Sequence, residues 1–126
     1  MGRKIVLAED DRFVRKATTA ALRQRGFEVI AVEDGEEALR QTRAERPDLV
    51  LLDMIMPKMQ GFQVLDALKQ DAETAGIPVI VCSSLEQAED QARAREAGAA
   101  AYIVKADLSL RDLARRVEEL LAEGNR

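Results

Sequence analysis

Short apolar runs alternate along the chain with longer segments in which apolar residues recur at helical spacing. Two of these runs, Leu49–Leu52 and Val79–Cys82, are apolar throughout, which is typical of strands covered on both faces in a parallel sheet. We predict five strands, at Ile5–Ala8, Val29–Val32, Leu49–Leu52, Val79–Cys82 and Tyr102–Val104.

The segments between the runs carry helix signals. In the first, Gly26 is well placed to end a helix. Ser109 and Asp112 resemble a capping box ahead of the last segment, which has the clearest apolar stripe. The positions expected to share inward helix faces are Val14, Ala17, Ala21, Leu22, Ala38, Leu39, Thr42, Val64, Leu65, Leu68, Leu110, Leu113, Val117, Leu120 and Leu121.

The fourth helical segment, residues 85–97, differs from the others. Its candidate inward face offers little beyond Ala88 and Ala92. Because burial of an apolar face supplies most of a helix's stability in a protein, we expect this helix to be the most weakly anchored of the five.

The regular alternation of strands and helices predicts the fold class. It implies right-handed crossovers and an open parallel sheet with helices on both faces, a doubly wound (βα)5 three-layer α/β sandwich. The 126 residues are enough for one domain of ordinary size. We therefore expect residues 1–126 to form a single domain, with no output domain after the last helix.

Composition narrows the classes of function. The net charge is −4, and no dense Lys/Arg stripe stands out, so direct nucleic-acid binding is not expected. Cys82 is the only cysteine, which excludes an intrachain disulfide and predicts a buried, reduced thiol. The chain has no signal-peptide pattern and no run long enough to cross a bilayer, so we expect a cytoplasmic protein without membrane contact.

Polar residues that can bind ligands or react follow four of the predicted strands directly. Ligands of open parallel α/β sheets bind just beyond the carboxyl ends of the strands. The first, third, fourth and fifth strands run out into Glu9-Asp10-Asp11, Asp53, Ser83-Ser84 and Lys105. Acids, hydroxyls and a lysine thus converge on one edge of the sheet.

Some of these residues have a purely structural alternative. A single acid after a strand is commonly a helix cap, and we prefer that interpretation for Asp11. Ser84 with Gln87, or Ser83 with Glu86, has the spacing of a capping box for the fourth helix.

Asp53 is the hardest of the set to explain by folding alone. It follows four apolar residues and precedes Met-Ile-Met-Pro57, and a carboxylate at the mouth of a buried strand has an electrostatic cost. Lys105 taken by itself would be an ordinary surface lysine. The combination is much less expected by chance than any one of its members.

The acids at this edge predict a metal site and a reaction class. Two carboxylates about 4 Å apart repel by about 4 kcal/mol at an effective dielectric near 20, so Glu9, Asp10 and Asp53 would raise one another's pKa or recruit a cation. Oxygen ligands with open positions favour Mg²⁺, which also binds phosphate oxygens. A carboxylate beside that ion can attack a phosphoryl group, with Ser83 and Lys105 facing the phosphoryl oxygens.

These motifs resemble the receiver domains of bacterial response regulators, including the single-domain chemotaxis-regulator type. The resemblance rests on Ile-Val-Leu-Ala-Glu9-Asp10-Asp11, Asp53-Met-Ile-Met-Pro57, Ser83-Ser84 and Tyr102-Ile-Val-Lys105. It covers roughly residues 4–122 in the family's order and spacing. It implies the flavodoxin-like fold with strand order 2-1-3-4-5 and the site between the first and third strands.

The resemblance also implies a role for each matching residue. Asp53 would be the phosphoacceptor, and Mg²⁺ would be bound by Glu9, Asp10, Asp53 and the backbone carbonyl of Ile55. Ser83 would be the switch hydroxyl, Lys105 the lysine that pairs with the phosphoryl group, and Tyr102 the aromatic whose ring changes rotamer.

Partners and output follow from the same resemblance. The phosphodonor would be a histidine kinase or a histidine phosphotransfer protein, and an unidentified protein would bind the surface of the fourth helix, fifth strand and fifth helix. The protein would be a monomer or weak dimer and not an enzyme, since it accepts the phosphoryl group on its own aspartate.

One departure from the family concerns the residue after Lys105. Receivers usually carry proline there, commonly after a cis bond, whereas this chain has Ala106. A non-proline cis bond costs about 3 kcal/mol, so the family's geometry does not carry over to the loop that leads to Asp107 and Leu108.

Two apolar residues near the site predict a long-lived phosphorylated state. Ile55 lies two residues after Asp53, and Leu85 two after Ser83, at positions where polar side chains could orient an attacking water. Because neither offers that water a hydrogen bond, we predict slow self-dephosphorylation.

Three rival interpretations compete with this one. A haloacid-dehalogenase-type phosphohydrolase would want a second acid where Ile55 stands, and a flavodoxin would want a Ser/Thr/Gly-rich phosphate loop in place of Glu9-Asp10-Asp11. The third rival is a receiver-shaped module that binds partners without phosphorylation. The intact acid, serine and lysine set disfavours that alternative, and Ala106 keeps it open.

Overall fold

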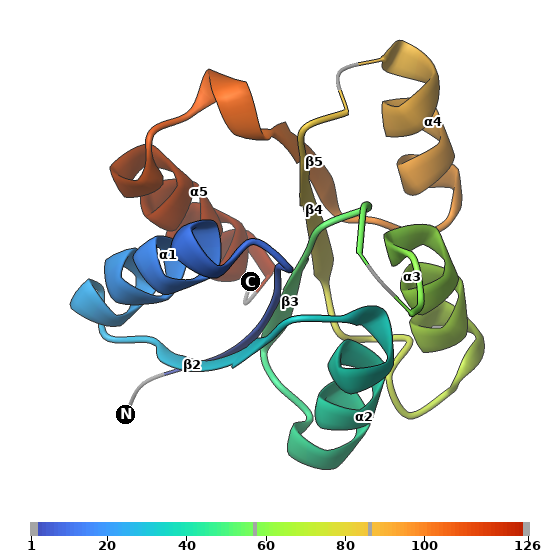
Figure 1. Ribbon diagram of the computed structural model, residues 1–126. Coiled ribbons are helices and arrows are strands. Elements are labelled where there is room, and N and C mark those ends of the chain that lie inside the picture. The colour runs from blue at the N-terminus through green and yellow to red at the C-terminus, as the bar shows by residue number, and fades with distance from the viewer. Residues whose placement is uncertain (1–2, 57, 86, 125–126) are drawn as a thin grey trace.

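A parallel sheet of five strands forms the centre of the molecule, with the strands in the order β2-β1-β3-β4-β5 (Figure 1). The computed structural model describes residues 3–56, 58–85 and 87–124. Pro57 of the Met-Ile-Met-Pro motif and Glu86 of the possible capping box lie outside these ranges. The strands are β1 (Lys4–Ala8), β2 (Glu28–Val32), β3 (Leu49–Leu52), β4 (Val79–Ser83) and β5 (Ala101–Val104). The predicted strands and their order are confirmed.

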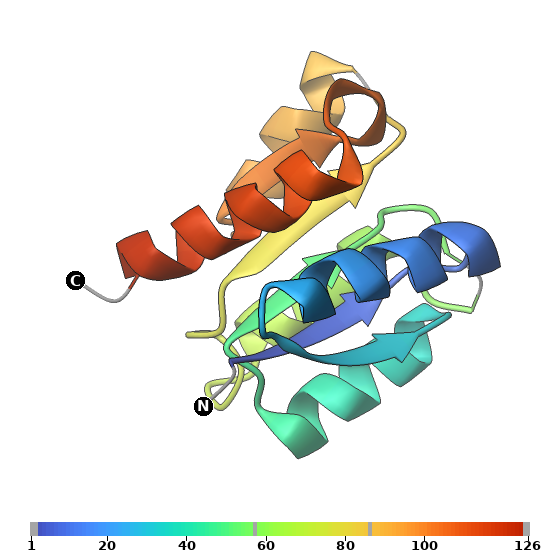
Figure 2. The ribbon, with the colours of Figure 1, turned by 90° about the vertical axis from the view of Figure 1, so that its left-hand side faces the viewer.

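Helices cover both faces of the sheet. They are α1 (Arg12–Gln24), α2 (Gly35–Glu45), α3 (Gly61–Gln70), α4 (Ala88–Glu96) and α5 (Leu110–Gly124), with a 3₁₀ turn, η1, at Lys105–Asp107. Helices α1 and α5 lie side by side on one face, and α2, α3 and α4 cover the other (Figures 1 and 2). The three-layer α/β sandwich is therefore confirmed.

The apolar strands divide their side chains between two cores. In β3, Val50 and Leu52 face α2, α3 and α4, whereas Leu49 and Leu51 face α1 and α5. This two-sided burial explains why the run is apolar at every position. Cys82 is buried as expected, and burial raises the pKa of its thiol to about 11.

The strand register determines where the site lies. Ala8 at the end of β1 pairs with Val32 on one side and with Leu52 on the other. The residues that follow β1 and β3, Glu9 and Asp53, therefore leave the sheet as neighbours at its carboxyl edge.

Helix α4 has the weakest apolar anchor, as predicted, but the residue that anchors it was not foreseen. Ala94 is its one buried residue, whereas Ala88 and Ala92 are exposed. The predicted inward face was therefore wrong. Helix α4 also begins later than expected, after Gln87.

Two of the predicted helix caps are present and one is not. Asp11 accepts hydrogen bonds from the backbone N–H groups of Phe13 and Val14, and the Ser109 hydroxyl accepts one from the backbone of Asp112. Ser83 and Ser84 do not cap α4, because Gln87 occupies the N-cap position without a side-chain hydrogen bond.

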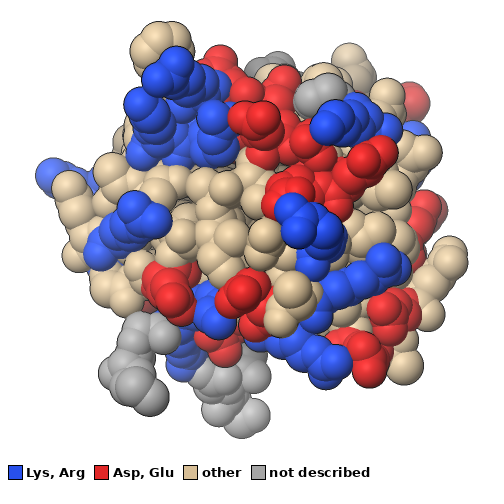
Figure 3. Space-filling view, turned by 60° about the horizontal axis from the view of Figure 1, so that its bottom comes forward, with Lys and Arg blue, Asp and Glu red and all other residues tan. Residues whose placement is uncertain are grey.

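The surface carries both signs of charge. On the face shown in Figure 3, Lys and Arg gather at the upper left and Asp and Glu at the upper centre, and the two signs are mixed on the right. Among the described residues, no helix is both long enough and apolar enough to span a bilayer.

Candidate functional site

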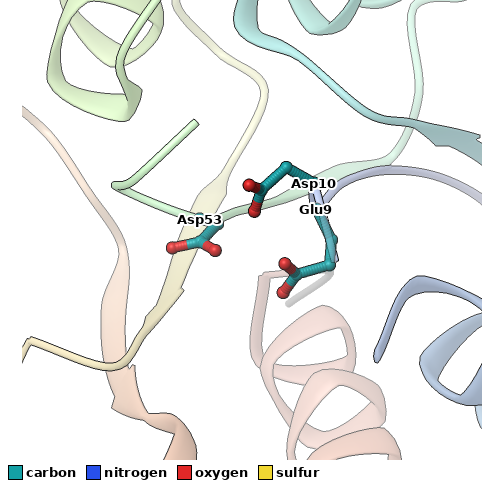
Figure 4. A group of neighbouring side chains, drawn as sticks. All are labelled: Glu9, Asp10 and Asp53. Carbon is teal, nitrogen blue, oxygen red and sulfur yellow. The ribbon is translucent and has the colours of Figure 1, made fainter. Parts of the chain in front are cut away.

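Three acidic side chains meet at the carboxyl edge of the sheet. Glu9 and Asp10 follow β1, Asp53 follows β3, and their carboxylates point into the same space (Figure 4). One ligand oxygen from each residue lies within 4.8 Å of the others. Glu9 and Asp53 are buried, at 3% and 4% exposure, whereas Asp10 is exposed. The acids that the sequence singled out are therefore brought together.

Backbone hydrogen bonds hold two of these acids where the strands end. The N–H of Glu9 donates to the carbonyl of Val32 at 3.0 Å, and the N–H of Asp53 donates to the carbonyl of Ala8 at 3.1 Å. The sheet ladder thus continues one residue beyond the strands, so both side chains start from a rigid backbone.

Lys105 places a positive charge between the two buried carboxylates. Its Nζ lies 2.9 Å from Oδ2 of Asp53 and forms a second ion pair with Glu9. Burial alone would lower the pKa of this ammonium group, but the bonds to Glu9 and Asp53 outweigh burial and raise the pKa. Lys105 therefore stays charged over the whole physiological range of pH.

Glu9 has a pKa above its ordinary value. Burial raises the pKa, and the negative charge of Asp53 adds to this effect, while hydrogen bonds from Lys105 and from the backbone of Asp11 oppose it. The folded chain therefore holds Glu9 in an environment that favours neutralisation of its charge by a proton or a cation.

Ser83 is the last residue of β4, and Tyr102 is the second residue of the neighbouring strand β5. Ser83 is fully buried, and its Oγ accepts a hydrogen bond from the N–H of Leu85 at 3.2 Å. Tyr102 is half-buried, and its hydroxyl donates to the carbonyl of Leu85 at 2.9 Å. Burial raises the pKa of Tyr102. No hydrogen bond within the described residues joins Ser83 to Asp53. Ser83 and Tyr102 both bond the backbone of Leu85, in the β4–α4 loop.

Comparison with known proteins identifies the family. The model of the response regulator receiver domain matches residues 5–118. The chain belongs to the response regulator receiver family. As such it is a receiver domain of two-component signalling.

The chain is similar to several curated proteins of different lengths. It is 38% identical to the "Gliding motility regulatory protein" of Myxococcus xanthus over 93% of this chain and 15% of that protein. It is 34% identical to the "Phosphate regulon transcriptional regulatory protein PhoB" of Escherichia coli (strain K12), over 96% of this chain and 52% of that protein. "Protein PilH" of Pseudomonas aeruginosa is 35% identical over 81% of this chain and 84% of its own length. The chain thus spans about half or less of the first two relatives.

Solved structures share the whole architecture. A "response regulator receiver domain protein (CheY-like)" from Methanospirillum hungatei JF-1 has a TM-score of 0.90 at 27% identity, covering 99% of this chain and 98% of its own. The "Mn(2+)-bound form of response regulator Rcp1" has a TM-score of 0.80 at 28% identity, covering 94% and 91%.

In this receiver domain the backbone directly after Asp53 contacts the carboxylate. The N–H of Ile55 donates to Oδ1 of Asp53 at 3.2 Å, while the Ile55 side chain is 52% exposed. At the end of the loop, a Cβ on Gly61 would collide with the carbonyl oxygen of Asp53 and with the Cα of Met54. Only glycine therefore allows α3 to begin so close to the site.

The loop after Lys105 does not have the cis bond that is common in the family. No cis peptide bond occurs among the described residues, and Lys105–Asp107 forms the turn η1. Lys105 nevertheless reaches both carboxylates, so the replacement of the family's proline by Ala106 leaves the ion pairs intact.

An open cavity leads to the site. It has a volume of about 490 Å³, lies between α1 and α5, and is lined mainly by apolar side chains, with exposed Phe13 on its wall. Glu9, Asp53 and Lys105 also line it. The two buried acids of the receiver, Glu9 and Asp53, therefore border this cavity.

One residue of the site was not singled out by sequence. Arg15 of α1 reaches back to the β1–α1 loop and donates to the backbone carbonyls of Glu9 and Asp10. Its position could have indicated this contact. Arg15 lies in the first turn of the helix that follows the acids, and long side chains of a helix point toward its N-terminus.

Proposed function

We propose that this receiver domain is a phosphorylation-activated switch whose phosphoacceptor is Asp53. The observation that carries the proposal is the environment of that carboxylate. It is buried, it lies 2.9 Å from the Lys105 ammonium, and it shares its space with Glu9 and Asp10. A structural carboxylate needs only the lysine, whereas additional acids raise the electrostatic cost unless a cation offsets it.

The donor set fits Mg²⁺. Carboxylate oxygens of Glu9, Asp10 and Asp53 lie within 4.8 Å of one another, and hard oxygen ligands of this kind suit a small divalent ion. The backbone carbonyl of Ile55 would complete the protein ligands. When bound, the ion neutralises charge on the carboxylates and on the incoming phosphoryl group. The response regulator Rcp1, a relative of the same fold, has an Mn(2+)-bound form, which supports a divalent cation in this receiver as well.

The proposed reaction transfers a phosphoryl group from a histidine of the donor protein to Asp53. A carboxylate oxygen of Asp53 forms a bond to phosphorus, and the P–N bond to the donor histidine breaks with its electron pair going to the imidazole. The Lys105 ammonium, freed from one carboxylate oxygen, pairs with a phosphoryl oxygen. Receiver domains interact with histidine kinases and with downstream effectors. The phosphoryl group would stay on the receiver itself, and the donor histidine would be left unphosphorylated.

The signal would pass through the β4–α4 loop. Ser83 would reorient toward the phosphoryl group, which breaks its contact with the N–H of Leu85. The hydroxyl of Tyr102 bonds the same residue, so its ring would respond to the same movement. The result is a population shift of the surface formed by α4, β5 and α5, where a downstream protein would bind.

The test is intact mass after incubation with a small acyl phosphate. We expect one phosphoryl adduct on the wild type with Mg²⁺, none without the metal, and none on Asp53→Asn. Asp66→Asn, which removes an exposed acid from α3, is the matched control and should be phosphorylated like the wild type. No adduct with either an acyl phosphate or a phosphohistidine donor protein would favour a binding module that works without phosphorylation.

A further inference from the structure

Arg15 ties helix α1 to the acidic loop by two hydrogen bonds. Its Nη1 donates to the backbone carbonyl of Glu9 at 3.0 Å and to that of Asp10 at 3.3 Å. The side chain is only 18% exposed, so most of its surface is packed against the protein. One guanidinium nitrogen therefore fixes two successive peptide groups, and those peptides carry two of the acids at the edge of the sheet.

Asp10 depends on this contact more than Glu9 does. Glu9 is also held by its own N–H, which donates to Val32, and by its carboxylate, which bonds Lys105 and the N–H of Asp11. Within the described residues, the Asp10 carboxylate has no hydrogen bond or ion pair, and the Asp10 backbone carbonyl accepts only from Arg15. The direction in which Asp10 points is thus set by its backbone, and Arg15 holds that backbone.

The charge of Arg15 is balanced on the side away from the acids. Its Nη2 lies 3.5 Å from Oε2 of Glu33, which follows β2 and is 70% exposed. The planar guanidinium can point one nitrogen at the carbonyls and another at Glu33, which a lysine ammonium on its single nitrogen cannot do. Arg15 can therefore hold the loop while Glu33 offsets part of its repulsion of a cation.

We propose that Arg15 is a positioning residue for the Glu9-Asp10 pair and that it increases the affinity of the site for Mg²⁺. It does so without touching the ion, by keeping both peptides in the orientation that turns their carboxylates toward Asp53. This inference rests on the proposed metal-dependent phosphorylation. Residues that orient metal ligands commonly change metal affinity by ten- to a hundredfold when they are removed.

Geometry and charge predict opposite results for Arg15→Ala. Removal of a positive charge near a cation site should strengthen cation binding, because it removes repulsion. Loss of the loop contact should weaken binding, because Asp10 is no longer held in place. A lower affinity of Arg15→Ala can therefore be assigned to positioning.

The experiment measures binding of Mn²⁺ by electron paramagnetic resonance, with Mg²⁺ as competitor and no phosphodonor present. We expect Arg15→Ala to weaken binding of both ions about tenfold or more. Arg15→Lys keeps the charge and should weaken binding several-fold, since it lacks the second guanidinium nitrogen with which Arg15 reaches Glu33 while Nη1 bonds the carbonyls. Arg12→Ala, which removes an exposed arginine from the same helix without touching the loop carbonyls, is the matched control for charge and should bind as tightly as the wild type or slightly more tightly.

Urea unfolding of each variant separates positioning from stability. A merely structural Arg15 would lower the free energy of unfolding of Arg15→Ala and leave the metal affinity of the folded protein unchanged, which would overturn the inference alone. If Arg15→Ala does not fold, the metal affinity of the charge-preserving Arg15→Lys is the test. An affinity of Arg15→Lys equal to that of the wild type would then overturn the inference. A wild type that bound neither Mn²⁺ nor Mg²⁺ would overturn the proposed function as well.

Discussion

The side chains near Asp53 are of two kinds. Some are charged, and others are apolar and offer an attacking water no hydrogen bond. Lys105 lies between the carboxylates of Glu9 and Asp53, and its raised pKa keeps the ammonium charged. Ile55 and Leu85, two residues after Asp53 and Ser83, have side chains without a polar group. In the proposed phosphorylation, Lys105 would help to capture the phosphoryl group, and Ile55 and Leu85 would affect how long the group stays on Asp53.

The side chain of Ile55 yields a prediction about lifetime. Replacement by asparagine supplies an amide that can hydrogen-bond an attacking water at an exposed position next to Asp53, the proposed phosphoacceptor. We expect Ile55→Asn to speed loss of the phosphoryl group about tenfold, which corresponds to about 1.4 kcal/mol in the barrier. Decay of the phosphoprotein, followed by intact mass after removal of the donor, measures the rate.

Ile55→Val is the control for this substitution, since it changes the size of the side chain without adding a hydrogen-bonding group. It should decay like the wild type. Equal decay rates for Ile55→Asn and Ile55→Val would show that the apolar residue does not set the lifetime.

At the scale of elements, α4 is the helix most easily displaced. It buries a single residue, Ala94, and its further anchor is Arg93, whose guanidinium carbon lies 3.9 Å from the centroid of the Phe62 ring on α3. A cation–π contact at an exposed position contributes about 0.5–1 kcal/mol. A helix held by one alanine and one such contact can shift at low cost.

Loss of the Arg93 contact should therefore loosen α4. We expect amide hydrogen exchange in residues 88–96 to become about two- to fivefold faster in Arg93→Ala, because the local opening free energy falls by the value of the cation–π contact. Arg95→Ala removes an exposed arginine from the same helix and should leave exchange unchanged. Exchange in Arg93→Ala that matched Arg95→Ala would contradict this account of how α4 is held.

The start of α2 gives a prediction about pH. The side chain of Asp34 accepts a hydrogen bond from the N–H of Glu37 at 2.8 Å. This bond, together with the Lys58 ammonium, lowers the pKa of Asp34. A carboxylate whose pKa is lower in the folded state stabilises the fold above its unfolded pKa of about 3.9, and this stabilisation is lost as pH falls through the folded pKa.

Urea unfolding of Asp34 variants tests that sign. At pH 7 we expect Asp34→Ala to lose about 1 kcal/mol in the free energy of unfolding, because the helix loses its cap. Asp34→Asn keeps a capping oxygen and should lose less. The difference between wild type and Asp34→Asn should shrink as pH falls from 5 to 3, and a difference independent of pH would contradict the proposed role of the ionised cap.

At the scale of the whole molecule, much of the architecture could be predicted from the pattern of apolar runs. Leu49–Leu52 could be identified as a central strand because both faces of it are buried. The acids at the strand ends could be placed together because parallel strands align their carboxyl ends. The order of the strands came from resemblance to receivers, since alternation alone does not fix it.

The features that could not be predicted depend on contacts between elements. Ala88, Ala92 and Ala94 have side chains of the same size, so the sequence gives no contrast from which to choose the inward face of α4. The carbonyl contacts of Arg15 depend on the path of the β1–α1 loop. The hydrogen bond from Tyr102 to Leu85 depends on where the β4–α4 loop lies relative to β5.

The most direct test of the central claim is to locate the phosphoryl group chemically. Borohydride reduces an acyl phosphate to an alcohol, which converts a phosphorylated aspartate to homoserine that a peptide map can identify. After phosphorylation with Mg²⁺ and an acyl phosphate, we predict homoserine at position 53 and unmodified acids at Glu9 and Asp10. Homoserine at another position, or unmodified Asp53 in a sample whose intact mass carries the adduct, would contradict the account.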